Sequence, residues 1–222
     1  GRSAQFSALL ATLNEAFREE DLRPVVIFQT DGDEFWNLRR TDDAGKWPPA
    51  PAKRQFSLAD IYRAAERSRA TVYSVVVGPR LLGLPPDKQE ERARVFLEQQ
   101  RATAEALSRP MDFGAGPLPS RERMRPLGDL RQSAEWILRT QAALAGLAEV
   151  TGGWADFLER PAQAEAVYSR IFSDVDERLV LGYYPTNRER DGRRRAVRVE
   201  VRGHPEYQVW GRKSYYAPGP GD

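Results

Sequence analysis

The sequence predicts an α/β fold with an antiparallel β extension at its C-terminal end. Two apolar runs rich in β-branched residues, residues 25–28 and 70–78, are separated by a stretch with helical periodicity. Beyond residue 178, strand-like segments succeed one another with no helix between them. The first pattern is typical of a parallel sheet whose strands are joined through helices, and the second is typical of a β meander.

The composition is that of a folded protein without a strong charge bias. Of the 222 residues, 41% are hydrophobic and 30% are charged, which excludes a disordered chain and allows one large domain or a domain with an appendage. The 34 basic and 32 acidic residues nearly cancel, so we expect no nucleic-acid partner. No apolar run approaches the roughly 20 residues that span a bilayer. Because the chain has no cysteine, disulfides, thiolate nucleophiles and cysteine-ligated zinc are excluded.

Five helices and one short strand are expected around the two apolar runs. The first helix is amphipathic, because apolar residues from Phe6 to Phe17 recur at helical spacing. A second begins at Ser57, a good N-cap with Asp60 three residues later. Further along, residues 151–153, Thr-Gly-Gly, form a glycine-rich stop for a long helix. The expected helices span residues 4–20, the segment from residue 57, and residues 85–107, 130–150 and 161–175; the short strand spans residues 154–158.

Three strand-like segments are expected to form the C-terminal meander. In the middle one, valines alternate with charged residues from Val197 to Arg202, which predicts one dry and one wet face. Asp191 and Gly192 predict a tight hairpin turn between the first two strands. We expect the tyrosines to pack in cross-strand pairs, and the arginine run at 193–195 to form a solvated edge. The three segments are residues 178–185, 194–201 and 207–216, and His204 is expected in a turn.

A cluster of three carboxylates comes after the first apolar run. Asp31 stands directly after Thr30, and Asp33 and Glu34 lie in a turn that Gly32 permits. In open α/β sheets, ligands gather at the carboxyl ends of the strands. Hard cations such as Mg²⁺ or Mn²⁺ prefer carboxylate and hydroxyl oxygens. Two interpretations stay open: the cluster binds a cation, or it only caps and solvates a turn.

The segment "VVIFQTDGDEF" resembles the fourth-strand segment of von Willebrand factor type A domains, which typically ends in Thr-Asp-Gly. The later elements of the chain are similar in order to those of the family. A helix precedes "VYSVVVG", and "LAEVTGGWADFL" stands where the family has a helix ending in Thr-Gly-Gly and an aromatic-rich short strand. The tail, from "RLVLGYYP" to "GRKSYYAPG", resembles the ending of bacterial von Willebrand factor A-related proteins that are abundant in acidobacteria. The resemblance covers almost the whole chain.

This resemblance implies a Rossmann-like sheet flanked by helices, from which the first strands of the fold are missing. The chain is then an N-terminally truncated, partial domain over residues 1–178, with insertions at about residues 33–56 and 81–129. Residues 179–217 form the antiparallel β extension, and residues 218–222 form a frayed tail. The family also implies export to the periplasm or the cell surface.

The resemblance further implies a metal-ion-dependent adhesion site, which in this family takes oxygens from three loops. Asp31 matches the aspartate of Thr-Asp-Gly, and Ser3 occupies the position of a loop threonine and keeps its hydroxyl. The Asp-x-Ser-x-Ser of the family's first loop does not occur in residues 1–222. The implied cofactor is Mg²⁺ or Mn²⁺, and the implied partner is a protein whose carboxylate completes the coordination. In the loop after Asp31, the residues Asp33, Glu34 and Trp36 are candidate members of the binding face.

Three functions are compatible with these observations. The favoured one is a non-enzymatic, adhesion-type protein-binding domain that acts through the metal at Asp31. The alternative is a structural module of the cell envelope or of an assembly, in which the metal site has been lost. A magnesium-dependent hydrolase built on Asp31 is the least favoured, because the sequence has no GxxxxGK[ST] phosphate loop and no G-x-S-x-G elbow.

Overall fold

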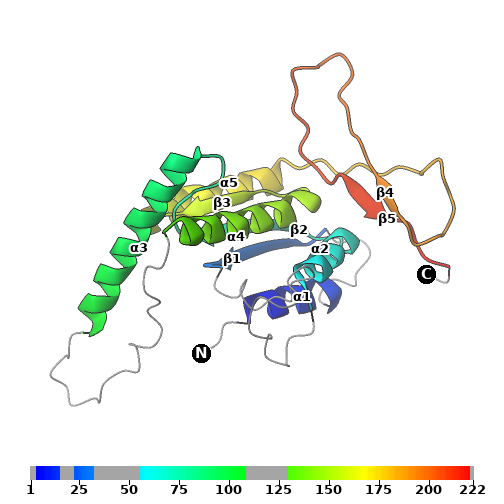
Figure 1. The fold of residues 1–222 in the computed structure, drawn as a ribbon. Coiled ribbons are helices and arrows are strands. Elements are labelled where there is room, and N and C mark those ends of the chain that lie inside the picture. The colour runs from blue at the N-terminus through cyan, green and yellow to red at the C-terminus, as the bar shows by residue number, and fades with distance from the viewer. Residues whose placement is uncertain (1–3, 16–22, 33–55, 109–129, 221–222) are drawn as a thin grey trace. The chain divides into compact units, whose positions relative to one another are not determined.

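The computed structural model of the chain describes residues 4–15, 23–32, 56–108 and 130–220 (Figure 1). Contacts between residues divide the chain into two units. The first comprises Gly1–Val77 and Ala143–Asp222, and the second comprises Gly78–Ala142. None of the helices that the structure describes is both long and apolar enough to cross a membrane.

The first unit is built on a three-stranded parallel sheet in the order β1-β2-β3. The strands are β1, Val25–Thr30, β2, Thr71–Val77, and β3, Ala155–Leu158. The central strand β2 is buried from Val72 to Val76, because it has a strand on either side. This sheet confirms the parallel arrangement predicted from the two apolar runs, and the short strand predicted after residue 153.

Helices pack on both faces of this sheet. On β2, Ser74 Oγ donates to the carbonyl of Leu144 in α4 (2.9 Å). Its neighbour Tyr73 points to the opposite face and packs in the core that includes α5. Phe6 of α1 packs edge-to-face on Phe28 of β1, with ring centroids 5.3 Å apart. The helices lie where helices were predicted: α1 is Gln5–Glu15, α2 Leu58–Arg67, α4 Leu130–Val150 and α5 Ala164–Asp176, the last preceded by the 3-10 turn Pro161–Gln163.

Local signals set the helix ends in the way the sequence predicts. At the start of α2, Ser57 and Asp60 form a capping box, in which the amide of Ser57 donates to Asp60 Oδ2 (2.8 Å). This backbone hydrogen bond is the main reason that the pKa of Asp60 lies below its ordinary value. At the end of α4, Gly152 adopts φ +83°, and the amide of Gly153 donates to the carbonyl of Ala148 (3.0 Å).

The second unit contains α3, Pro86–Ser108, and the part of α4 that precedes residue 143. Gln141 is 1% exposed and fastens the segment before α3. Its Oε1 accepts from the amides of Leu81 (2.9 Å) and Leu82 (3.0 Å), and its Nε2 donates to the carbonyl of Pro79 (2.6 Å). The insertion predicted at residues 81–129 falls in this unit as far as residue 108, and residues 109–129 lie outside the described residues.

The C-terminal extension contains two short strands and not the predicted three. β4, Arg194–Ala196, pairs antiparallel with β5, Ser214–Tyr216. The prediction of a strand at residues 178–185 is wrong: no strand of the described chain pairs with this segment, and Leu179 is 87% exposed. The predicted hairpin turn at Asp191 and Gly192 is also wrong: Gly192 has φ +65°, but residues 191–193 form no turn, and the amide of Gly192 donates to the carbonyl of Pro218 (3.1 Å).

The predicted dry face of the middle segment is also wrong. The strand ends at Ala196, and beyond it Val199 is 42% and Val201 41% exposed, because the described chain places no strand beside them. The described strands contain no cross-strand tyrosine pair, so this prediction is wrong: Tyr183, which lies in no described strand, contacts Tyr215 edge-to-face with centroids 6.2 Å apart, and Tyr184 is 93% exposed. His204 lies in a turn, as predicted, and its ring contacts Glu206 and Tyr207.

The extension is fastened to α2. The Glu66 carboxylate accepts from Arg194 Nε (2.7 Å) and Ser214 Oγ (3.2 Å). The guanidinium of Arg212 donates to the carbonyls of Glu66 (2.8 Å) and Ala70 (2.9 Å), just where the last carbonyls of α2 lack a helical partner. Burial lowers the pKa of Arg212 from its ordinary value. The β4–β5 pair is thus anchored by a carboxylate and a half-buried arginine.

The arginine run at 193–195 is a solvated edge at its first two residues and not at Arg195. Arg193 is 84% exposed at its side chain, as predicted. Arg194 pairs with Glu66, and Arg195 is only 14% exposed at its side chain. Arg195 donates to the carbonyl of Glu189 (2.6 Å) and to Asp191 Oδ1 (3.2 Å), so that it ties the preceding loop to β4. The prediction is wrong for Arg195, whereas Arg194 is 53% exposed at its side chain although it pairs with Glu66.

Candidate binding edge of the parallel sheet

The candidate site lies at the carboxyl end of β1, where Thr30 closes the strand. Thr30 is 2% exposed, and its Oγ1 accepts from the amide of Gly32 (2.9 Å). Gly32 has φ +80°, a conformation that favours glycine, so the chain can turn sharply after the strand. This turn leaves Asp31 exposed at the edge of the sheet, on the side where ligands of open α/β folds gather.

A second segment of the chain reaches the same edge through Gln5, at the start of α1. Gln5 Oε1 accepts from the hydroxyl of Thr30, and Gln5 Nε2 lies 3.5 Å from Asp31 Oδ1. The N-terminal end of α1 therefore lies against the carboxyl end of β1. No local pattern signals this role of Gln5, which only the contact between the two segments reveals.

Of the five predicted site residues, the structure describes one. Asp31 lies at the predicted edge, whereas Ser3, Asp33, Glu34 and Trp36 lie outside the described residues. Within the described part of the chain, no group of three or more His, Cys, Asp or Glu side chains could hold a metal ion. Because Mg²⁺ demands near-octahedral oxygen coordination, the carboxylate of Asp31 does not form a metal site by itself.

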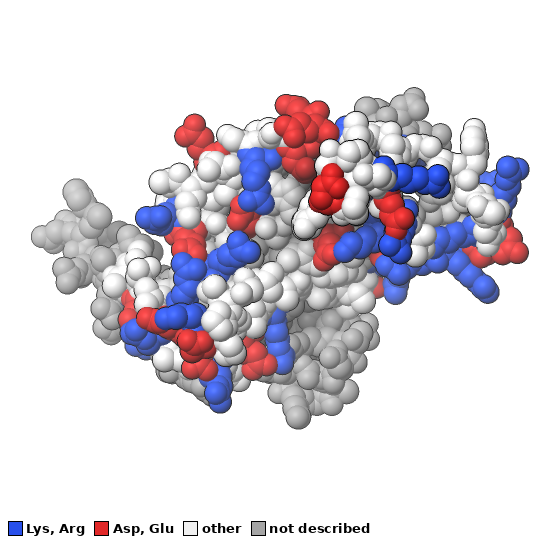
Figure 2. Space-filling model, turned by 90° about the horizontal axis from the view of Figure 1, so that it is seen from above, with Lys and Arg blue, Asp and Glu red and all other residues white. Residues whose placement is uncertain are grey.

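The described surface adds no strong field that would select a ligand by charge alone. Figure 2 shows basic and acidic side chains interspersed over the face that it draws. This agrees with the near balance of 34 basic and 32 acidic residues. The face drawn in Figure 2 therefore has no extended area of one charge sign that would attract a ligand at long range.

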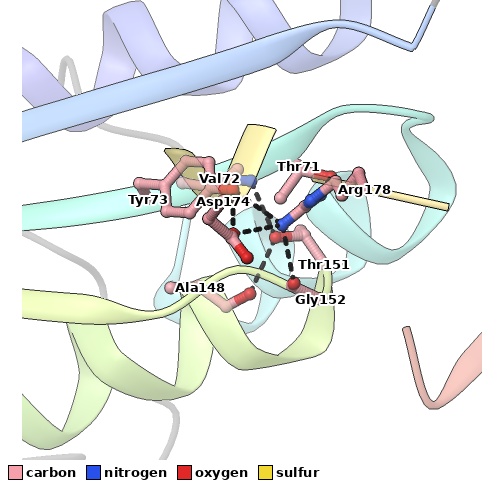
Figure 3. A network of polar contacts seen from close by, with 8 residues as sticks. All are labelled: Thr71, Val72, Tyr73, Ala148, Thr151, Gly152, Asp174 and Arg178. Atoms are coloured by element: carbon pink, nitrogen blue, oxygen red, sulfur yellow. Dashed lines mark hydrogen bonds and ion pairs between the residues drawn. The ribbon is translucent and has the colours of Figure 1, made fainter. Parts of the chain in front are cut away.

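At the opposite, amino edge of the sheet lies a polar cluster that the sequence patterns did not predict (Figure 3). Arg178 Nη2 donates to Tyr73 Oη (2.8 Å), to Asp174 Oδ2 (3.0 Å) and to the carbonyl of Gly152 (3.1 Å). Its Nη1 donates to Thr71 Oγ1, and the hydroxyl of Tyr73 donates to Asp174. These five residues, the Arg178 network, join α5 to β2 and to the end of α4.

The Arg178 network has the geometry of a structural clamp. Burial, together with the hydrogen bond to Asp174, raises the pKa of Tyr73 well above its ordinary value, so the phenol stays neutral and donates. The guanidinium is shared among several oxygens, and the phenol of Tyr73 both accepts from Arg178 and donates to Asp174. The spacing of Asp174 and Arg178, four residues apart, was the signal that could have predicted the pair.

Comparison of the chain with protein-family models, curated proteins and solved structures yields no match. The α/β architecture with a parallel sheet and a separate antiparallel pair is a property of the structure itself. The von Willebrand factor A assignment stays a prediction that rests on the sequence motifs.

Proposed function

We propose that the chain is a protein-binding module whose binding face is the carboxyl edge of its parallel sheet, centred on Asp31. The observation that carries the proposal is the exposed carboxylate of Asp31 at the end of β1, beside the start of α1. Two segments distant in sequence converge there, which is the usual way in which a fold of this class builds a ligand site. The motif resemblance supports the same edge, and it supports a role at the periplasm or the cell surface.

The proposed chemistry is a divalent cation that bridges the module to its partner. Asp31 supplies one oxygen ligand to Mg²⁺ or Mn²⁺, and the partner is a protein that presents a carboxylate to the ion. A cation held by few protein charges keeps its affinity for an external anion, which is why such an ion can link two proteins. Further ligands have to come from outside the described residues, and Ser3 is the candidate that the sequence motif suggests.

Calorimetric titration with Mn²⁺ tests the proposal. We expect saturable binding to the parent chain and loss of that binding in Asp31→Ala. The matched control is Asp176→Ala, which removes an exposed aspartate at the end of α5, away from the carboxyl edge. Equal Mn²⁺ affinity in all three proteins would refute a role of Asp31 in metal binding.

A structural module without a metal is the second candidate, and one observation favours it. The polar groups at this edge already satisfy one another, since the Thr30 hydroxyl and the Gly32 amide are hydrogen-bonded within the chain and Gln5 contacts Asp31. This candidate predicts no Mn²⁺ binding and an unchanged free energy of unfolding when Mn²⁺ is added. Urea unfolding with Mn²⁺ and with EDTA distinguishes the metal-binding module from the structural module. A ligand that binds only the folded protein raises the free energy of unfolding.

A further inference from the structure

The C-terminal extension carries strand-forming sequence that the described chain leaves unpaired. Residues 197–201, Val-Arg-Val-Glu-Val, come directly after β4 and continue its alternation. In the described part of the chain, the backbone groups of residues 198–200 make no hydrogen bond. Val199 and Val201 are 42% and 41% exposed. A β-branched, alternating segment with a free backbone is a template for pairing with another strand.

Among the described residues, no strand pairs with the edge of β4 that faces away from β5, and the backbone groups along this edge have the correct phase to receive one. Arg193 O accepts from Ala217 N (2.9 Å), and Val197 N donates to Lys213 O (2.8 Å), so the backbone groups of these odd-numbered residues face β5. Backbone groups alternate along a strand, so those of Arg194 and Ala196 point to the other edge. If the strand continues past Ala196 in the same direction, the backbone groups of Arg198 and Glu200 point to that edge as well.

The segment is complementary to itself. Within one chain, Arg198 Nη2 forms an ion pair with Glu200 Oε1. If a second copy pairs antiparallel with Val199 opposite Val199, each Arg198 also faces the Glu200 of the other copy, and each Val197 faces a Val201. Opposite charges directly across a pair of strands stabilise it, and aligned valines fill one face. Shifting the register so that Val201 faces Val201 brings Gly203 and Pro205 into the pairing, and proline weakens a strand. Placing Glu200 opposite Glu200 sets like charges against each other.

We infer that two copies of this chain associate by antiparallel pairing of residues 196–202, with Val199 at the two-fold axis. The two β4–β5 pairs then join into one four-stranded sheet in the order β5-β4-β4-β5. A two-stranded ribbon is marginally stable alone, and a sheet of three or more strands is the stable form, so the association has a physical reason. It uses the extension only and does not depend on a metal at Asp31.

Single cysteine substitutions test the register directly, because the natural chain has no cysteine. In the inferred pairing, position 199 faces itself in a non-hydrogen-bonded pair, with Cα atoms about 4.5 Å apart, within reach of a disulfide. We expect Val199→Cys to form a disulfide-linked dimer under mild oxidation, with EDTA present throughout. Val201→Cys is the matched control, because its two copies lie about 14 Å apart along the strands.

Charge substitutions and sedimentation in the full chain complete the test. We expect a concentration-dependent dimer for the parent chain. In Glu200→Arg, each Arg198 faces an arginine, and the dimer dissociation constant should rise about tenfold. The double variant Arg198→Glu with Glu200→Arg restores opposite charges and should restore the parent affinity. A monomer at every concentration, or cross-linking of Val201→Cys as efficient as that of Val199→Cys, would overturn the inference.

Discussion

Gly153 lets the end of α4 lie directly against the backbone of β2. A Cβ atom at this position would stand 2.0 Å from the carbonyl oxygen of Val72, closer than any non-bonded contact allows. A nearby residue makes the same junction polar: Thr151 Oγ1 accepts from the amide of Val72 (2.8 Å) and donates to the carbonyl of Ala148 (2.8 Å). The Thr-Gly-Gly motif therefore has a structural reason, which is to end a helix on a strand at close range.

Replacement of Gly153 by alanine should destabilise the fold. The added methyl meets main chain that cannot move aside, and we expect a loss of about 3 kcal/mol in the free energy of unfolding. Chemical denaturation of the purified variant measures this loss. Gly182→Ala is the control, because no atom lies within 4 Å of a Cβ built there. A Gly153→Ala protein as stable as the parent would contradict the close approach.

Tyr62 is a second residue with a measurable role, since its phenol is mostly buried against α4. Its hydroxyl donates to the carbonyl of Ala143 (2.6 Å), and a Cβ on Gly146 would lie only 2.4 Å from that hydroxyl oxygen. Burial, and to a lesser degree the charge of Glu149, raises the pKa of Tyr62 from 10.0 to about 12. The neutral phenol is therefore the form that the folded chain holds.

The contribution of Tyr62 to the free energy of unfolding should decrease at alkaline pH. Below pH 10.0 it is fully present, and Tyr62→Phe should cost about 1 kcal/mol, the usual value of one hydrogen bond. As pH rises from 10.0 towards about 12, the unfolded phenol ionises before the folded one, so the difference between parent and variant should shrink. Urea unfolding of both proteins at a series of pH values tests this, and a constant difference would argue against a raised pKa.

The β4–β5 pair is an element that depends on its neighbour. Its two strands contribute three residues each, too few to be stable as an isolated ribbon. Its position is fixed by Arg212, which donates to carbonyls at the end of α2, and by Glu66, which holds Arg194 and Ser214. The order of the extension is therefore coupled to α2.

Arg212→Met should loosen the extension without unfolding the sheet. The thioether keeps the bulk of the side chain but leaves two carbonyls without their donor, a loss of about 2 kcal/mol for hydrogen bonds to a charged group. Hydrogen exchange should speed up in β4 and β5, while amides of β2 stay protected. Arg101→Met, at an exposed position of α3, is the control. Equal protection of β5 in both variants would show that Arg212 is not the anchor.

Elements with strong local signals could be predicted from the sequence. Periodicity located the helices, the apolar runs located β1 and β2, and the capping residues Ser57 and Asp60 marked the start of α2. The extension could not be predicted in the same way, because alternation at 197–201 reports a tendency to pair and does not identify a partner. The roles of Arg194 and Arg195 depend on acceptors distant in sequence or within a loop, which local patterns do not show.

Over the whole molecule, the sequence predicted where the candidate site lies. It predicted only some of the residues that form it. The rule that ligands gather at the carboxyl ends of parallel strands placed Asp31 at the edge where the structure has it. The contribution of Gln5 could not be predicted, because it depends on how α1 docks against β1. The metal and the partner stay predictions that the titration with Mn²⁺ tests.

The position of the Arg178 network affects which amino-acid substitutions the fold can tolerate. It holds α5, β2 and the end of α4 together at the amino edge of the sheet, whereas Asp31 lies at the carboxyl edge of the same sheet. In the proposed function, stability and recognition are therefore assigned to opposite ends of the strands. Substitutions near Asp31, whether in evolution or in a randomised library, then alter the proposed binding face without removing any member of the clamp.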